Sequence, residues 1–312
     1  MSPAPKLAGS CSSPRLVYNG KVRFALPLLL VAVCAGCARP TTAPTAVSTA
    51  PTFPADDLGR PIALRKPAQR VVAIGPGLVE TFFALGAKRK LIGRDDFADF
   101  PAAVKTVAIA GNYQGPNVEQ TLALRPDLVI VQGETSNRAK FDDWQSKLGV
   151  PVAALTTTSF GGLAKNLRQV GAWIGQSKDA ETLARKFEVA APKATKGRAL
   201  IQTGDEIGFI AGSGTLVSDA AARAGWGNIA DELGIKGYQQ VGVETFLVHQ
   251  PDALVVPSKK TKAQVLAALR GQPGLAKLRC VQSGRVLVVD GDLLLRPGPR
   301  LLQGVEQLKA AK

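Results

Sequence analysis

One stretch of this sequence occurs twice, and the repetition limits the folds open to the chain. Residues 113–131 read YQGPNVEQTLALRPDLVIV, and residues 238–256 read YQQVGVETFLVHQPDALVV. The two copies are offset by 125 positions and are identical at 8 of 19. One repeat at this spacing predicts two similar lobes, because a solenoid needs about three or more shorter units. The alternative is two unrelated segments that share a helix, a Pro-Asp turn and a strand.

Both copies have the same local pattern. A short amphipathic segment carries a glutamate near its start, Glu119 or Glu244, where a negative charge complements the helix dipole. A proline then ends the helix, and an apolar run follows at 128–131 or 253–256. Such runs are typical of strands buried on both faces in a parallel sheet. We therefore expect two α/β lobes with mainly parallel sheets and a ligand site between them.

The amino-terminal part has the features of an export signal. Lys21 and Arg23 precede an apolar run at 24–33, and small residues follow it. The run is too short for a permanent membrane span, which needs about 20 apolar residues. The sequence therefore predicts a chain that is carried across a membrane.

The end of this signal resembles the lipobox of bacterial lipoproteins. It reads Cys-Ala-Gly-Cys, and the departure from the lipobox pattern is Cys34, where leucine is usual. The resemblance implies that Cys37 is lipidated and becomes the first residue of the mature chain. Residues 1–37 are then a signal peptide, and 38–55, rich in Thr, Ala and Pro, are an extended tether to the membrane.

Charge and cysteine content exclude several classes of function. The chain has 39 Lys and Arg and 24 Asp and Glu; residues 1–37 hold 4 of the cations and none of the acids, so the remainder carries 35 − 24 = +11. The cations are dispersed and lack aromatic interleaving, which argues against nucleic acid as a partner. After cleavage only Cys37 and Cys280 remain, so neither a disulfide framework nor a cysteine-rich metal site can form.

The rest of the chain alternates strands and helices. The apolar run 71–74 is followed by Gly75, Pro76 and Gly77 and then by a helical segment, an arrangement that presents backbone amides above a sheet. A later helix, at 179–191, is expected to cross from one lobe to the other. The predicted parts are a first lobe, a linking helical segment and a second lobe, at 56–160, 161–197 and 198–312.

The ordered set of motifs resembles one family. Besides the strand and turn just described, it contains Val-Glu-x-x-Leu-x-x-x-Pro-Asp in both lobes, Gly-Asn-Ile-Ala at 227–230 and Asp-x-x-x-Arg-x-Gly-Pro-Arg at 292–300. In order and spacing these motifs are similar to the cobalamin and ferric-chelate solute-binding proteins of ABC importers. The resemblance implies two Rossmann-like lobes joined by a single connecting α-helix, with a metal chelate in the cleft. Two departures are Pro192 in a short linking segment and the lack of an arginine two positions after Tyr113, which ranks heme below cobalamin and ferric siderophores.

The resemblance also assigns residues to the ligand site. Tyr113 matches an aromatic residue placed against the corrin, or a nearby tyrosine that ligates heme iron. Asp292 and Arg296 match an acidic and a basic contact. For the aromatic residues the alternative is burial in the core of their own lobe. The expected ligand contacts are Gly75, Pro76, Gly77, Tyr113, Gln114, Glu134, Trp226, Tyr238, Asp292 and Arg296.

The two repeated glutamates match a further family feature. The resemblance implies that Glu119 and Glu244 pair with arginines of the permease, where exposed ion pairs contribute about 0.2–1 kcal/mol each and serve mainly for register and steering. The alternatives are helix-start electrostatics and ligand contact.

Together these features predict an exported, lipid-anchored, monomeric protein that delivers a metal chelate to an ABC permease and has no cofactor of its own. The competing interpretation is a surface enzyme on the same scaffold. The only histidine, His249, stands at a helix end, and Ser213 lacks the Gly-x-Ser-x-Gly context of a hydrolase. A serine triad is therefore not expected.

Overall fold

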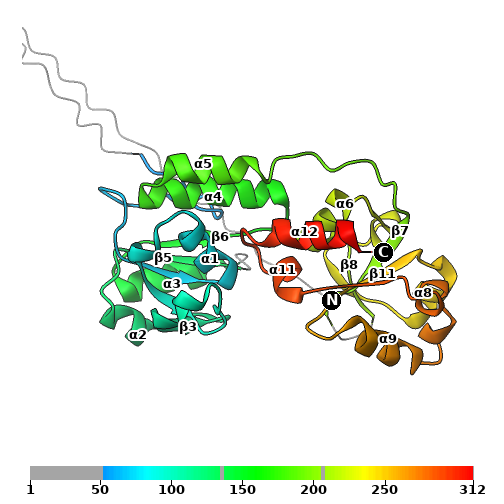
Figure 1. Ribbon diagram of the computed structural model, residues 1–312. Coiled ribbons are helices and arrows are strands. Elements are labelled where there is room, and N and C mark those ends of the chain that lie inside the picture. Colours follow the sequence, from blue (N-terminus) through cyan, green and yellow to red (C-terminus); the bar gives the residue numbers. More distant parts are fainter. Residues whose placement is uncertain (1–51, 134–136, 205–207, 312) are drawn as a thin grey trace, which may run out of the picture. The chain divides into compact units, whose positions relative to one another are not determined.

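The computed structural model describes residues 52–133, 137–204 and 208–311. These residues belong to one compact unit, Thr49–Lys312, in which strands and helices alternate (Figure 1). The predicted signal peptide, the lipidation site Cys37, most of the tether and the predicted ligand contact Glu134 lie outside the described residues. Within the described ranges, no helix has the length and apolar character needed to cross a bilayer.

A six-stranded sheet forms the centre of the first lobe. Its order is β4-β3-β2-β1-β5-β6, and every pairing is parallel except that of β3 with β4. The predicted apolar strands are fully buried in β1 and β6 and nearly so in β5. The strands are β1 (Val71–Ile74), β2 (Leu91–Asp95), β3 (Ala108–Asn112), β4 (Gly115–Pro116), β5 (Leu128–Gln132) and β6 (Val152–Leu155).

Three α-helices and two short 3-10 helices connect these strands. The side chains of Asn117 and Asn137 cap α2 and α3 by accepting hydrogen bonds from the third backbone amide that follows each of them. The glycine turn before α1 places a proline in its first turn, where no intrahelical bond is lost. The helices are α1 (Pro76–Ala84), η1 (Lys88–Lys90), η2 (Ala102–Thr106), α2 (Val118–Ala123) and α3 (Arg138–Leu148).

The second lobe contains a smaller parallel sheet of order β12-β11-β7-β9 and a separate antiparallel pair, β10 with β8. The strands are β7 (Arg198–Ile201), β8 (Phe209–Ala211), β9 (Gly227–Asn228), β10 (Tyr238–Gln240), β11 (Ala253–Pro257) and β12 (Val286–Val289). The helices are α6 (Leu216–Arg223), α7 (Ile229–Glu232), α8 (Val243–His249), α9 (Lys262–Arg270), η3 (Leu275–Lys277), α10 (Arg279–Gln282), α11 (Gly291–Leu295) and α12 (Leu301–Ala310).

The repeated stretch takes equivalent places in the two sheets. Helix α2 leads into β5, which lies between β1 and β6, and α8 leads into β11, which lies between β7 and β12. All four of these pairings are parallel. The prediction of two similar α/β lobes is therefore confirmed. The copies differ at their first residue, because Tyr113 follows β3 in a loop, whereas Tyr238 is the first residue of β10.

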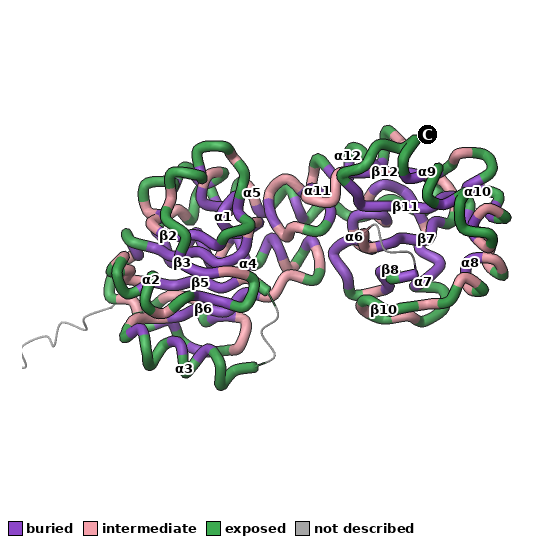
Figure 2. Tube along the Cα trace, turned by 90° about the horizontal axis from the view of Figure 1, so that it is seen from below, coloured by how far each residue is buried: buried purple, intermediate pink, exposed green. Residues whose placement is uncertain are grey.

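Two helices, α4 (Phe160–Ile174) and α5 (Ser177–Arg185), pack against the cores of both lobes. The first half of α4 contributes to the core of the second lobe, and its second half, including Trp173, contributes to the core of the first. Figure 2 shows the central strands of both sheets buried while the outward faces of the helices are exposed.

The second of these helices is shorter than the helix predicted at 179–191. It ends at Arg185, and the chain continues to β7 without further helix. The last turn tightens, with the amide of Phe187 bonded to the carbonyl of Ala184 at 2.9 Å, and the ring of Phe187 is buried against Phe160 at 5.7 Å between centroids. The boundaries of the three predicted parts stay predictions.

Candidate functional site

A cavity of about 620 Å³ opens at the carboxyl ends of β1, β2, β3 and β5 in the first lobe, beside one face of α3. This place is a topological switch point, because β1 is followed along the chain by β2 on one side and is paired with β5 on the other. The lining residues are Ile74, Gly75, Pro76, Asp95, Phe97, Asn112, Tyr113, Gln114, Val131, Gln132, Gly133, Asn137, Lys140, Phe141 and Trp144.

The loop after β1 is held by a buried carboxylate. Gly75 has φ 127°, which favours glycine, and its amide donates to Asp95 Oδ2 at 2.9 Å. The other oxygen of Asp95 accepts from the amide of Phe97 at 2.9 Å. Burial raises the pKa of the Asp95 carboxyl, and these two hydrogen bonds oppose that rise. Asp95 thus fixes two lining loops against each other.

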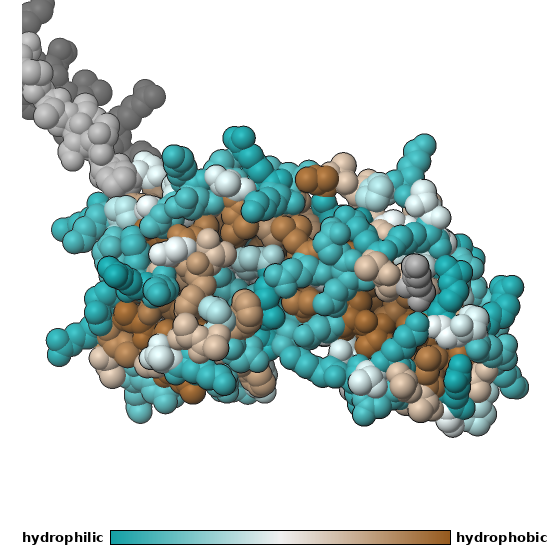
Figure 3. Space-filling model, viewed as in Figure 1, coloured by the Kyte–Doolittle hydropathy of each residue, from teal (hydrophilic) through white to brown (hydrophobic). Residues whose placement is uncertain are grey.

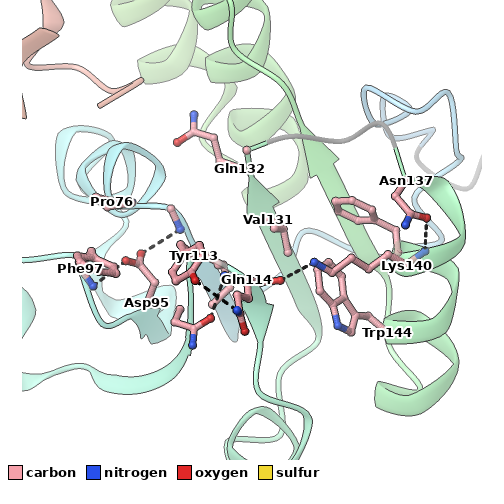
Figure 4. Close-up of a pocket in the computed structure, with 15 residues that line it drawn as sticks. Pro76, Asp95, Phe97, Tyr113, Gln114, Val131, Gln132, Asn137, Lys140 and Trp144 are labelled. Carbon is pink, nitrogen blue, oxygen red and sulfur yellow. Dashed lines mark hydrogen bonds between the residues drawn. The ribbon is translucent and has the colours of Figure 1, made fainter. Parts of the chain in front are cut away.

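Aromatic side chains form walls of the cavity. Tyr113 is 80% exposed, and Phe97 is 57% exposed and meets Tyr113 edge to face at 6.5 Å between ring centroids. Trp144 lies on α3, where it packs edge to face on Phe141 at 5.2 Å. Figure 4 shows Tyr113 and Gln114 on one side of the cavity and the side chains of α3 on the other. Exposed aromatic rings at a cavity suit a ligand with a flat or apolar surface.

One helix face supplies the remaining polar wall. Asn137, Lys140 and Trp144 follow one another at helical spacing and therefore point the same way. Lys140 Nζ donates to the carbonyl of Gln114 at 2.7 Å and lies 4.8 Å from the centroid of the Trp144 ring (Figure 4). Lys140 is the only cation among the described residues that line the cavity. It provides a positive charge for an anionic group of a ligand.

A buried acceptor among the lining residues has no partner in the described part of the chain. Gln132 donates from Nε2 to the hydroxyl of Thr157 at 3.2 Å and to the carbonyl of Pro297 at 2.9 Å. Its Oε1 is buried and accepts no hydrogen bond from the described residues. A buried acceptor without a donor costs roughly 1–3 kcal/mol, so this atom is open to a donor.

Four of the predicted ligand contacts lie together in this cavity: Gly75, Pro76, Tyr113 and Gln114. Gly77 lies instead inside the packing of α1, where an added Cβ would stand 2.3 Å from the carbonyl oxygen of Pro297. The absence of a side chain at Gly77 lets α1 approach the backbone of Pro297 closely, and Gly77 does not line the cavity.

The predicted contacts of the second lobe are not part of this cavity. Arg296 pairs with Asp292 at 3.0 Å and with Asp99, in the loop after β2, at 2.5 Å. Lys259 also pairs with Asp292. The hydrogen bond from Arg296 lowers the pKa of the Asp99 carboxyl. Arg296 therefore already has two carboxylate partners, one from each lobe.

Two aromatic residues are placed differently from their prediction. Trp226 is buried at the amino-terminal end of β9, within the core of the second lobe and between Lys196 and Arg285, and it does not line the cavity. Burial in its own lobe was the alternative for this residue. Tyr238 is 49% exposed and stacks on Phe209 at 6.5 Å between centroids, away from the residues that line the cavity.

The two glutamates with a predicted docking role occupy matching positions. Glu119 is the second residue of α2, and Glu244 is the second residue of α8. Both are exposed. The predicted place near the start of a helix is confirmed, and pairing with a permease stays a prediction.

Several lining residues were not found from the sequence. These are Asp95, Phe97, Asn137, Lys140, Phe141 and Trp144. The available signal for the inward face of α3 was Asn137 before the helix together with Trp144 at helical spacing.

Comparison with known proteins agrees with this architecture. The family model described as "Periplasmic binding protein" matches residues 71–293. A vitamin B12-binding protein of Pectobacterium carotovorum subsp. carotovorum is 26% identical over 249 residues, which is 77% of this chain and 87% of that protein. An uncharacterized ABC transporter substrate-binding lipoprotein of Bacillus subtilis, YvrC, is 26% identical over 314 residues, 91% of this chain and 94% of that protein.

Among solved structures, a periplasmic heme binding protein from Pseudomonas aeruginosa is 30% identical with a TM-score of 0.65, covering 78% of this chain and 92% of that one. The vitamin B12 binding protein of Vibrio cholerae has the same fold, with a TM-score of 0.63 over 78% of this chain and 96% of that chain at 23% identity. Because the family model covers most of the chain, the chain belongs to the periplasmic binding protein family.

Proposed function

We propose that this protein captures a metal chelate outside the cytoplasm and delivers it to the permease of an ABC importer. The family consists of solute-binding proteins for transport and not of enzymes, so the competing interpretation as a surface enzyme is set aside. Relatives named for vitamin B12 and for heme support a bulky metal chelate as the ligand. Cobalamin, a ferric siderophore and heme are the three candidates.

The observation that carries this proposal is the cavity at the switch point of the first sheet. Its volume of about 620 Å³ lies within the range of about 300–1,000 Å³ usual for small-molecule sites. Phe97, Tyr113 and Trp144 offer aromatic surface to the ring or chelate, and Lys140 offers a cation to a carboxylate or another anionic group. This combination favours a chelate that is apolar on one face and anionic at its edge.

Titration of the purified protein with each chelate tests the proposal. The chain has three tryptophans, and Trp173 and Trp226 are buried at 0% and 3% exposure, so quenching that disappears in Trp144→Phe reports binding at the cavity. We expect cyanocobalamin, hemin or one ferric siderophore to quench this fluorescence and to release or absorb heat in calorimetry. If none of them does so, the proposal is wrong.

The variant Lys140→Met tests whether the ammonium group of Lys140 binds an anionic group of the chelate. We expect it to weaken binding of an anionic chelate by about 1.5–3 kcal/mol, the value of a hydrogen bond to a charged group, and to leave a neutral chelate almost unaffected. Lys277→Met, at an exposed lysine of η3, is the matched control and should change neither affinity. Equal losses for anionic and neutral chelates would mean that Lys140 acts through the shape of the cavity.

We also propose that Glu119 and Glu244 dock on the permease. Their support is the repeated stretch, which gives both lobes the same exposed carboxylate at the start of a helix. Reversing both charges to lysine should impair chelate uptake in vesicles that contain the permease, because each docking pair would become a repulsion. The affinity of the isolated protein for the chelate should stay unchanged, and a large loss of that affinity would instead assign the glutamates to the ligand.

Export and lipidation at Cys37 complete the proposal. Support comes from the sequence pattern and from a relative named as a lipoprotein. The mass of the exported chain tests it, since processing at this site gives a diacylglyceryl cysteine as the first residue.

A further inference from the structure

Positive charge collects at the amino-terminal edge of the first sheet, opposite the cavity. Each segment concerned precedes a strand of this sheet or begins α5, and because β1, β2, β3 and β5 are parallel, their amino ends share one edge. We call the following cations the basic edge: Arg65, Lys66, Arg70, Lys88, Arg89, Lys90, Lys105, Arg125 and Lys178. All are exposed except Lys90, which is half-buried.

Hydrogen bonds to backbone carbonyls hold several of these segments together around the end of α4. Lys90 Nζ donates to the carbonyl of Ile174 at 2.6 Å, and the amide of Ala68 donates to the carbonyl of Trp173 at 2.8 Å. Arg70 donates to the carbonyls of Leu124 and Arg125 at 2.6 and 2.9 Å. The segments before β1, β2 and β5 therefore meet at one place.

The charges of the basic edge are not neutralised. Segments 65–70, 88–90, 102–106, 125–127 and 177–180 carry two acids, Asp127 and Asp179, against the nine cations. No cation of the basic edge forms an ion pair within the described residues. The charges of Lys90 and Arg70 are partly compensated, because both side chains donate hydrogen bonds to carbonyls at the ends of helices. The other seven cations have no such partner there.

The opposite, carboxyl edge of the sheet carries Asp95, the last residue of β2, and Asp96 and Asp99 in the loop after it. Asp95 lines the cavity, and Asp99 pairs with Arg296. An anionic surface would therefore attract the basic edge and leave the cavity directed away from that surface.

The described chain also begins at the basic edge. Trp173 Nε1 donates to the carbonyl of Pro54 at 2.9 Å, which ties the first described residues to the end of α4, as Figure 1 shows for the blue segment beside α4 and α5. Between Cys37 and Thr52 lie 14 residues, counted as 38–51. Even fully extended at about 3.3–3.6 Å per residue, they keep this edge within roughly 50 Å of a lipid attached at Cys37.

We propose that the basic edge docks on the anionic phospholipid headgroups of the membrane that holds the anchor. This inference rests on the proposed anchoring at Cys37, but it concerns a surface that does not include the chelate cavity. Lys and Arg residues near an anionic bilayer each strengthen attachment several-fold at physiological salt. Docking at this edge presents the ligand cavity away from the lipid.

Vesicle flotation with the full chain tests the proposal. We expect vesicles of phosphatidylcholine with about 30% phosphatidylglycerol to bind the protein at least tenfold better than phosphatidylcholine alone, and we expect high salt to remove the difference. The triple change Lys88→Glu, Arg89→Glu and Lys178→Glu should reduce binding to the anionic vesicles at least about tenfold. Binding to neutral vesicles should not change, because any insertion of the apolar run 24–33 is common to all samples.

A matched variant separates this surface from net charge. Lys193→Glu, Lys236→Glu and Lys277→Glu change the total charge equally at exposed sites outside the basic edge and should lower binding less than about threefold. Equal losses of vesicle binding in the two variants would overturn the proposal. The proposal would also be overturned if the triple change at Lys88, Arg89 and Lys178 abolished binding to an anionic polysaccharide and left vesicle binding intact. The chelate titration should be unchanged in both variants. If the glutamate variant does not fold, Lys88→Gln with Arg89→Gln gives the same comparison with less repulsion.

Discussion

Replacing Arg300 by methionine should lower the free energy of unfolding by about 3 kcal/mol, because it leaves a buried carboxylate without its cation. Glu80 of α1 has a side chain only 3% exposed, and Arg300, just before α12, is 14% exposed. The guanidinium donates twice to the carboxylate, at 2.6 Å and 2.9 Å, and lies 4.0 Å from the centroid of the Phe100 ring. Chemical denaturation monitored by circular dichroism measures this loss.

The large effect is expected because the ion pair lies where two segments, 220 positions apart in the sequence, pack closely together. Residues of the same segment approach α1 closely, since an added Cβ at Gly298 would stand 2.7 Å from the Cα of Gly77. This close packing limits the access of water to the Glu80 carboxylate when Arg300 is removed. An uncompensated charge at such a place costs more than the pair itself contributes.

Two further variants decide whether the unpaired charge is the cause. Arg300→Met combined with Glu80→Leu removes both charges and should recover most of the lost stability, because a buried ion pair can often be replaced by apolar groups of similar volume. Arg65→Met, at an exposed arginine without an ion pair in the described part of the chain, should change the unfolding free energy by less than about 0.5 kcal/mol. If the double variant is as unstable as Arg300→Met, the packing of the guanidinium on Phe100 is responsible instead.

The sequence predicted most of the fold because buried parallel strands and amphipathic helices have strong local patterns. The apolar runs at 71–74, 128–131 and 253–256 are strands in the structure. The antiparallel pair of β8 and β10 was missed. These strands have three residues each and are partly exposed, so their pairing, and not their pattern, defines them.

The site was predicted less completely because it depends on contacts between distant segments. Tyr113 was assigned to the site by the family resemblance, and in the structure it follows β3 directly and lines the cavity. Lys140 could not be assigned to the site, because the inward face of α3 is set by how the helix packs on the sheet. Arg296 was expected to contact the ligand. In the structure it forms an ion pair with Asp99, which lies 197 positions away, and the sequence near Arg296 does not indicate this partner.

Trp226 illustrates the opposite error. Its ring was expected to contact the ligand, with burial in its own lobe as the alternative. In the structure its neighbours come from separate segments, with Lys196 before β7 and Arg285 before β12 lying 6.0 Å and 5.8 Å from the ring centroid. On the face of the molecule drawn in Figure 3, side chains are mainly hydrophilic, and apolar groups are seen between them. Burial is a property of the packed chain, and local sequence indicates it only where a pattern repeats.

Gly115, in β4, lies directly against the indole of Trp144, which is a wall of the cavity. This residue has φ 131°, and an added Cβ would stand 2.1 Å from Cζ2 and 2.4 Å from Cη2 of Trp144. Trp144 cannot retreat easily, because it is 9% exposed, packs on Phe141 and lies beside Lys140. An alanine at this position therefore forces the indole to move, and the indole is a wall of the cavity.

Gly115→Ala should consequently weaken chelate binding at least about tenfold and lower the free energy of unfolding by about 2–4 kcal/mol, the sum expected for overpacking and for a strained backbone. Calorimetric titration and chemical denaturation measure the two effects separately. Gly161→Ala is the matched control, since its Cβ would meet nothing nearer than Ser159 Oγ at 4.0 Å on an exposed face of α4, and it should leave both quantities nearly unchanged. Unchanged affinity in a destabilised Gly115→Ala protein would show that the chelate does not contact Trp144, and the ligand site would then lie outside this cavity.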